Sequence, residues 1–173
     1  CRALARVDPD DLASKLERAE ERGDIDASNE AAAALWRAEP GHPAAFRVLA
    51  ASHRVAGELA ALTELAETRA QKALVASDRA GAWLEVARLA DELDHPAEAA
   101  RAYDRVLADD PQHTVALDAR AQLAYHAFDF ETAHRLYEAL PAGDSSLGAD
   151  ELALRRSIVA ERLGRQSEAL ELA

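Results

Sequence analysis

Residues 99–103 read Ala-Ala-Arg-Ala-Tyr, and residues 133–137, 34 positions further along, read Ala-His-Arg-Leu-Tyr. In both stretches an alanine and a tyrosine stand four residues apart, which places them on the same face of a helix. Pro111 follows the first stretch and Pro141 the second, and each proline predicts the end of its helix. A repeat of this length is typical of arrays of helical hairpins, in which each hairpin buries its apolar face only against its neighbours.

The composition predicts an all-α protein. Of the 173 residues 43 are alanine, the residue with the highest helix propensity, whereas aromatic residues make up only 5%. A β-rich chain would need more β-branched and aromatic residues. The formal net charge of −12 argues against nucleic acid or an anionic lipid surface as a partner. No apolar run approaches the roughly 20 residues that cross a bilayer, so we expect no membrane insertion.

The ends of the chain and its basic residues bear on its origin. Cys1 is the only cysteine and methionine is absent, so we interpret the chain as a fragment of a larger protein without an internal disulfide. Only two of the 20 basic residues are lysines, which together with the excess of alanine suggests a bacterial source. A soluble, cytoplasmic location is favoured. A periplasmic or lipid-anchored location stays open, because mature bacterial lipoproteins begin with a lipidated cysteine.

Capping and turn residues divide the chain into ten predicted helices. Asp8-Pro9 is a helix start, and Gly23-Asp24 ends the first helix and begins the second. The fourth helix is expected to run from Leu59 toward Ala76. The ninth is expected from about Asp150 to Leu163, with a tenth over 164–173.

This pattern resembles the tetratricopeptide repeat (TPR), a pair of helices with a glycine-containing turn between them. Its second helix carries alanine and an aromatic residue, and proline follows. Residues 80–113 match best, through Trp83, Ala99, Tyr103 and Pro111. The resemblance implies a right-handed α-solenoid of antiparallel helix-turn-helix repeats over residues 9–173, preceded by a tail at 1–8. The repeats would lie at 9–42, 43–76, 80–113, 114–147 and, incompletely, 150–173.

Some positions depart from the family pattern. Asp94 and Phe128 stand where the family usually has glycine, and Ser77 to Arg79 are three extra residues before the repeat at 80–113. The spacing from Ala133 to Ala169 is 36 rather than 34 residues. We therefore expect a less regular array at these two joints.

No motif predicts an enzyme, a cofactor or a metal site. His42 and His113 each lie two residues after a proline, at equivalent places in their repeats, which favours a structural role at a turn. No His-Glu-x-x-His spacing, nucleophile elbow or glycine-rich phosphate loop is present. Trp36 and Trp83 fall at positions that pack between helices.

In the TPR family the first helix of each repeat lines a concave groove that contacts peptides. Tyr125 is the strongest single candidate, because an aromatic residue with a polar tip on a polar helix face suits a contact. Some members clamp a C-terminal carboxylate with Lys, Asn and Arg, but here only the arginines are present, which disfavours a cochaperone of chaperone tails. The expected groove residues are Arg47, Arg54, Leu84, Arg88, Asp91, Asp118, Gln122, Tyr125 and Ile158, together with Glu17, Glu20, Glu21, Ala51, Leu154 and Glu161.

The sequence thus predicts a non-catalytic scaffold or adaptor that binds a protein or peptide in the groove. Two alternatives stay open: a regulatory or substrate-docking arm of a larger multidomain enzyme, and an envelope lipoprotein assembly factor. The incomplete last repeat, with Leu170 and Leu172, also predicts self-association through an open end or a frayed terminus.

Overall fold

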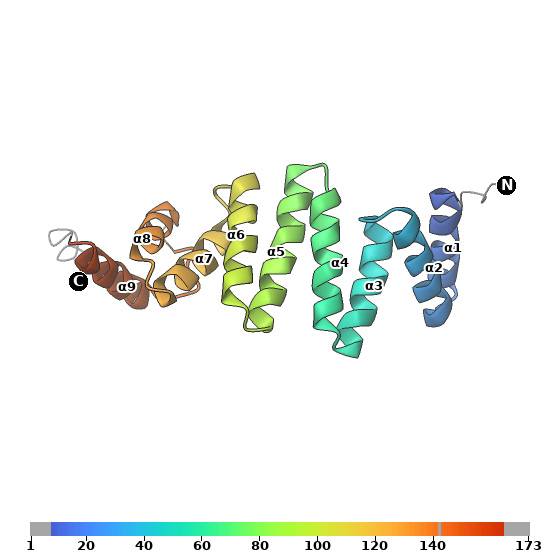
Figure 1. Ribbon diagram of the computed structural model, residues 1–173, viewed down its shortest axis with the longest axis horizontal. Coiled ribbons are helices and arrows are strands. Elements are labelled where there is room, and N and C mark those ends of the chain that lie inside the picture. The colour runs from blue at the N-terminus through green and yellow to red at the C-terminus, as the bar shows by residue number, and fades with distance from the viewer. Residues whose placement is uncertain (1–7, 142, 165–173) are drawn as a thin grey trace. The chain divides into compact units, whose positions relative to one another are not determined.

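The computed structural model describes residues 8–141 and 143–164, and this part of the chain consists of nine α-helices without a β-strand (Figure 1). The chain divides into two compact units, Cys1–Leu89 (unit 1) and Ala90–Ala173 (unit 2). Cys1, the predicted tenth helix and both leucines of the open end lie outside the described residues. The helices are α1 (Pro9–Glu21), α2 (Ile25–Ala38), α3 (Pro43–Ala56), α4 (Leu59–Lys72), α5 (Ala76–Glu92), α6 (Pro96–Asp109), α7 (Thr114–His126), α8 (Phe130–Ala139) and α9 (Ala149–Arg162).

The helices begin where the capping residues predict. Asp8 accepts a hydrogen bond from the backbone N–H of Asp10, and Pro9 occupies the first turn of α1. Asp24 caps α2 and Asp129 caps α8 in the same way, each through a side-chain oxygen. These carboxylates satisfy backbone donors that have no partner within the helix and complement the positive end of its dipole.

Four hairpin turns share one backbone geometry. One or two residues after each first helix the backbone is left-handed, with φ between 56° and 73°, at Gly23, Gly57, Asp94 and Phe128. The next backbone N–H then donates to a carbonyl five residues back, over 2.8 to 3.1 Å. This bond is the Schellman closure of a helix C-terminus, for which glycine is the usual residue. The hairpins therefore keep the same turn although two of them lack the glycine.

One apolar cluster of unit 1 is built from small and branched residues of α1, α2 and α3. Its buried members are Leu12, Leu16, Ala32, Leu35 and Ala45. Trp36 packs against this cluster and lies half-buried, whereas Trp83 on α5 is buried. Both tryptophans thus serve packing, as their repeat positions predict.

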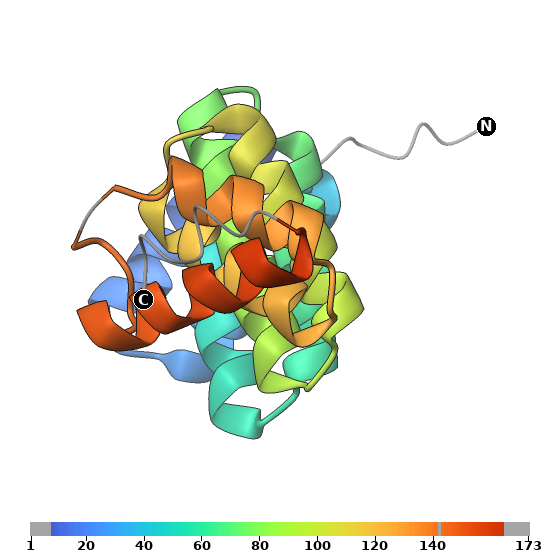
Figure 2. The same ribbon diagram turned by 90° about the vertical axis from the view of Figure 1, so that its left-hand side faces the viewer.

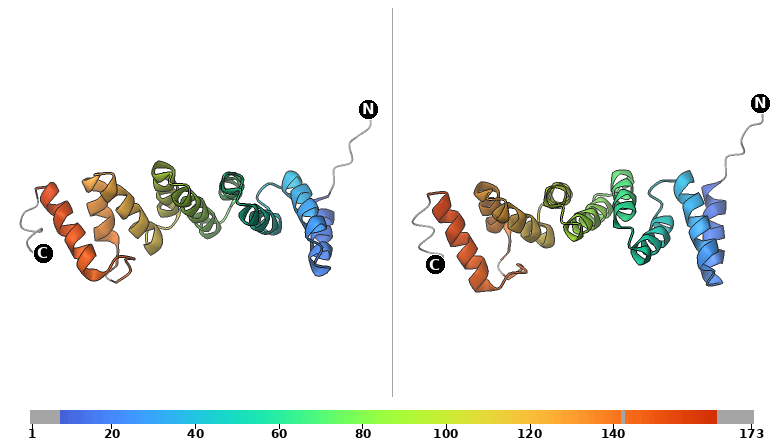
Figure 3. Two further views of the ribbon diagram at one scale, coloured as in Figure 1. Left: turned by 90° about the horizontal axis from the view of Figure 1, so that it is seen from below. Right: turned by 60° about the horizontal axis from the view of Figure 1, so that its bottom comes forward.

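The alanines and tyrosines of the two opening stretches, Ala99, Tyr103, Ala133 and Tyr137, are all buried in unit 2. α9 lies against α8 (Figures 2 and 3), and Arg156 of α9 donates a hydrogen bond to the Tyr137 carbonyl. The repeated stretch is therefore a packing device, in which alanine lets neighbouring helices approach closely and tyrosine fills the space between them.

The joint between α4 and α5 differs from the prediction. α4 ends at Lys72 rather than near Ala76, and α5 begins at Ala76, so the three extra residues form the first turn of a 17-residue helix. Ala73 is extended, and Leu74 and Val75 are exposed. Asp78 in the first turn favours a helix start here, because a carboxylate is stabilised at the positive end of the helix dipole.

No helix among residues 8–141 and 143–164 is both long enough and apolar enough to span a membrane.

The turn between α2 and α3 requires a glycine. Gly41 has a φ of 100°, and a Cβ placed on it would lie 2.7 Å from the Cβ of Lys72 at the end of α4. Gly57 is also left-handed, at 73°, but a Cβ there would meet no atom within 4 Å. Only Gly41 therefore combines backbone strain with a close approach.

We predict that Gly41→Ala lowers the free energy of unfolding by about 2 kcal/mol, because the clash adds to the left-handed penalty of about 1 kcal/mol. Gly57→Ala is the matched control. It should lower the free energy of unfolding by only about 1 kcal/mol, which is the backbone penalty alone. Urea unfolding of both variants measures the difference. Equal losses of unfolding free energy in the two variants would show that the close approach of Lys72 to Gly41 does not contribute to the effect.

Candidate functional site

A groove on unit 1 has a mainly apolar lining and a volume of about 500 Å³. It is formed where the end of α1 and the start of α2 meet one face of α3. We call it the unit 1 groove. Its lining comprises Glu20, Gly23, Ile25, Ser28, Asn29, Arg47, Val48, Ala51, Ser52 and Val55.

Two apolar side chains of the unit 1 groove lie open to solvent. Ile25 is 75% exposed and Val55 is 92% exposed, while Val48 between them is half-buried. Leaving such side chains in water forgoes the roughly 25 cal/mol per Å² that burial provides. Clustered exposed apolar residues beside a cavity, with a polar rim, are the usual mark of an interaction surface.

An ion pair forms the polar rim of the unit 1 groove. Arg47 of α3 donates to both carboxylate oxygens of Glu20 on α1, over 2.7 and 2.8 Å. The Arg47 side chain is exposed and that of Glu20 is half-buried, and ion pairs near the surface contribute about 0–1 kcal/mol. The guanidinium can therefore exchange Glu20 for a carboxylate of a bound partner at small cost.

Arg54 stands two turns after Arg47 on the same face of α3, with Ala51 between them. It donates to Glu85 of α5 over 2.7 Å. Leu84, next to Glu85, is half-buried, and Arg88, one turn further along α5, is exposed. Arg47, Ala51 and Arg54 thus follow one face of α3, and carboxylates of α1 and α5 pair with its two arginines.

Asp118 and Gln122 of unit 2 lie in a different setting from the expected open helix face. Asp118 is only 5% exposed and accepts hydrogen bonds from the Ser145 hydroxyl and from the Ser146 hydroxyl and backbone N–H. Gln122 donates to Asp118 and to Ser146. Burial by itself would raise the pKa of the Asp118 carboxyl, but these hydrogen bonds hold it below its ordinary value of 3.8. The carboxylate fixes the loop that leads from α8 to α9.

Tyr125 and Ile158, both predicted site residues, come together in a cavity of about 240 Å³ in unit 2. We call it the aromatic pocket; its lining is completed by His126, Phe128, Phe130 and Arg162. The guanidinium of Arg155 lies 5.0 Å from the centroid of the Tyr125 ring. Asp91, in contrast, accepts a hydrogen bond from the Tyr103 hydroxyl over 2.8 Å and lines neither cavity.

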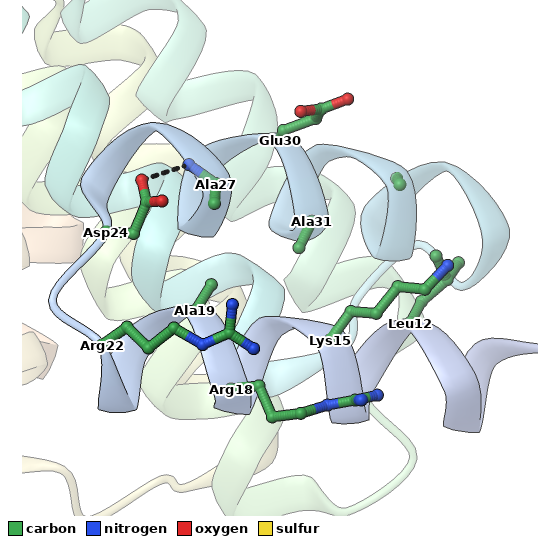
Figure 4. Close-up of a pocket in the computed structure, with 10 residues that line it drawn as sticks. Leu12, Lys15, Arg18, Ala19, Arg22, Asp24, Ala27, Glu30 and Ala31 are labelled. Carbon is green, nitrogen blue, oxygen red and sulfur yellow. Dashed lines mark hydrogen bonds between the residues drawn. The ribbon is translucent and has the colours of Figure 1, made fainter.

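A third cavity, of about 410 Å³, lies between α1 and α2 (Figure 4). Its lining includes Lys15 and Arg18 of α1, Arg22 directly after α1, and alanines of α2. Its apolar lining consists of Leu12 and small alanines, so it offers less apolar contact than the unit 1 groove. In the described part of the chain, His, Cys, Asp and Glu side chains form no group of three suited to a metal ion.

Three surface residues escaped prediction from the sequence. Ile25 and Val55 lie outside the apolar stripe of their helices, Phe128 lies in the turn between α7 and α8, and all three are exposed. In the sequence, only the place of each residue next to a helix end or in a turn could have marked it as a surface residue. Ile25 directly follows the cap Asp24, Val55 sits in the last turn of α3, and Phe128 replaces the glycine of a turn.

No protein family model matches the chain, and no curated protein matches it in sequence. Solved structures do match it in fold. MamA aligns with a TM-score of 0.60 and 15% identity, covering 95% of this chain and 87% of its own. A tetratricopeptide repeat protein from Parabacteroides merdae gives a TM-score of 0.59 and 20% identity, over 95% and 63% of the two chains. YrrB, a TPR protein with an unusual peptide-binding site, gives 0.59 and 9%, over 91% and 78%. The predicted TPR-type, all-α fold is thus confirmed.

We predict that Asp118→Asn destabilises the protein at pH 7 by about 2 kcal/mol, since it weakens several hydrogen bonds to a buried charge. Because the folded-state pKa is depressed, the contribution of this carboxyl is complete above about pH 4 and is lost as the pH falls through the folded-state value. The variant should therefore lose less stability than the wild type on acidification.

Urea unfolding at pH 7 and below pH 4 tests this prediction. Asp144→Asn, an exposed carboxylate in the same loop, is the matched control and should change stability little at either pH. A variant as stable as wild type at pH 7 would show that Asp118 does not hold the loop.

Proposed function

We propose that the chain is a non-catalytic protein-interaction module and that its unit 1 groove binds a peptide or helix of a partner protein. The observation that carries this proposal is the pairing of a cavity of about 500 Å³ with two exposed apolar side chains, Ile25 and Val55. The TPR-type fold supports it, as does the peptide-binding site of YrrB.

Binding would join apolar burial with exchange of an ion pair. Ile25, Val48 and Val55 offer contacts to apolar side chains of the partner, which would contribute most of the affinity. Arg47 would release Glu20 and pair with a carboxylate of the partner, setting its direction in the groove. The preferred partner is therefore an amphipathic segment with apolar anchors and at least one acidic residue.

The titratable groups support a non-catalytic role. Hydrogen bonds within the fold account for the lowered pKa of Asp118 and of Asp129, which caps α8. Burial raises the pKa of the Tyr137 hydroxyl, in the core of unit 2. Burial would lower the pKa of the Arg155 guanidinium, but Glu151 and Tyr137 beside it raise it overall. A general acid or base is a titratable group whose pKa is shifted and which lies in a cleft beside a reacting atom. Each of the groups named here serves packing, capping or ion pairing instead.

We predict that Val55→Glu abolishes capture of the partner protein, because it places a charge among the apolar contacts and leaves the fold unchanged. Leu74→Glu is the matched control: Leu74 is 96% exposed in the same unit but lies outside the groove. A photoreactive side chain at position 51 should cross-link the partner, and mass spectrometry then identifies the bound segment. If the Val55→Glu variant still captures the partner, the partner does not bind in the unit 1 groove. The same conclusion follows if Leu74→Glu abolishes capture equally.

The arginines of α3 and α5 provide a second, electrostatic test. Arg54→Glu and Arg88→Glu should each weaken partner binding by about tenfold while helicity by circular dichroism stays intact, because the partner is expected to be acidic. Arg54→Glu also places two carboxylates together, so Arg54→Glu with Glu85→Arg serves as the control that restores the ion pair. If this swap restores binding, internal repulsion rather than partner contact explains the single variant.

A further inference from the structure

The turn between α7 and α8 holds a bulky residue in a backbone conformation that suits glycine. Phe128 has a φ of 60°, whereas the equivalent turns carry Gly23, Gly57 and Asp94. Aspartate enters the left-handed region several times more readily than most residues, but for a bulky side chain that conformation is an outlier. The fold would be relieved of this strain by a glycine, as at Gly57.

The side chain of Phe128 does not compensate for this strain by burial, since it is 77% exposed. Its ring packs edge-on against Phe130, with centroids 6.1 Å apart and an interplanar angle of 75°. Phe130 meets Tyr125 in the same manner, at 6.3 Å and 74°. Three aromatic rings thus form a continuous surface whose outermost member lies in water. Strain and exposure together indicate a residue kept for something other than packing.

Basic residues form the rim of the aromatic pocket. Arg162 and His126 line it and no carboxylate does, although the whole chain carries a net charge of −12. Arg155, over the Tyr125 ring, is already paired with Glu151 over 2.7 Å, whereas Arg162 forms no ion pair with a described residue. The placement of Arg162 and His126 in the last turns of α9 and α7 also suits the helix dipoles. The dipoles do not account for the exposed Phe128 ring in the same pocket.

We propose that the aromatic pocket is a second docking site, which takes one phenylalanine or leucine side chain from an acidic peptide segment of a partner protein. Its volume of about 240 Å³ suits a single large side chain and is less than half that of the unit 1 groove. The guest side chain stacks on Phe128 and Phe130, and flanking carboxylates pair with Arg162. A cationic guest, which the aromatic rings alone would attract, is disfavoured by Arg162.

This proposal goes beyond the unit 1 groove and stands independently of it, because none of its residues belongs to unit 1.

Three labelled pentapeptides test the proposal on the whole chain by fluorescence anisotropy: acetyl-Asp-Glu-Phe-Asp-Glu-amide, the same peptide with alanine at its centre, and one with lysine in place of every acid. We expect the first to bind and both controls to bind at least tenfold more weakly. Amide chemical shifts on binding should change around residues 125–130 and 158–162.

Phe128→Gly separates binding from folding. Glycine accepts the left-handed turn, so the thermal midpoint should stay unchanged or rise, while affinity for the acidic phenylalanine peptide falls at least tenfold. Asp94→Gly, the same change in the α5–α6 turn, should leave the affinity unchanged. Arg162→Glu should weaken binding of the acidic phenylalanine peptide and strengthen binding of the lysine peptide.

Three results would overturn the proposal. They are failure of the acidic phenylalanine peptide to bind at millimolar concentration, full affinity of Phe128→Gly, and equal or tighter binding of the lysine peptide. The last result would instead assign the exposed rings to a cationic guest.

Discussion

Close packing of small side chains between neighbouring helices is the constraint on which the rest of the structure depends. Ala32, Ala45, Ala66, Ala99, Ala121 and Ala133 are completely buried. Each lets the next helix approach, and larger residues such as Leu35 and Tyr137 fill the space that remains. A hairpin built in this way is incomplete without its neighbour. One face of each described helix therefore packs against its neighbours, which leaves the opposite faces and the turns available for contact with a partner.

This division explains what the sequence alone could predict. Alternation of small and large residues, capping aspartates and left-handed turns are local features, so they predicted the helices and the TPR-type fold. The end of α4 was misplaced, because the stop at Ala73 is not marked by glycine or proline. The need for glycine at position 41 depends on Lys72, which lies far along the chain but close in space.

The candidate sites were harder to predict, for a physical reason. Helical spacing assigned Asp118 and Gln122 to an open face, yet the loop after α8 folds back and uses both as anchors. Conversely, Ile25 and Val55 do not stand out in the sequence, and Phe128 stands out only as the replacement of a turn glycine. Their exposure in the structure shows that they are not core residues. Tyr125 and Ile158 were predicted separately, and the fold brings them into one pocket. Spacing within a helix identifies its faces but not what covers them.

The central claim is that packing residues and recognition residues form two separate sets in this chain. A saturation mutagenesis scan of the whole chain, scored once for folded protein and once for capture of the partner protein, tests it most directly. The account predicts that substitutions at buried positions such as Ala32 and Leu35 impair folding. Polar or charged substitutions at Ile25, Val48 and Val55 should impair capture while the protein stays folded. If capture is lost only where folding is lost, the unit 1 groove has no role in recognition and the account is contradicted.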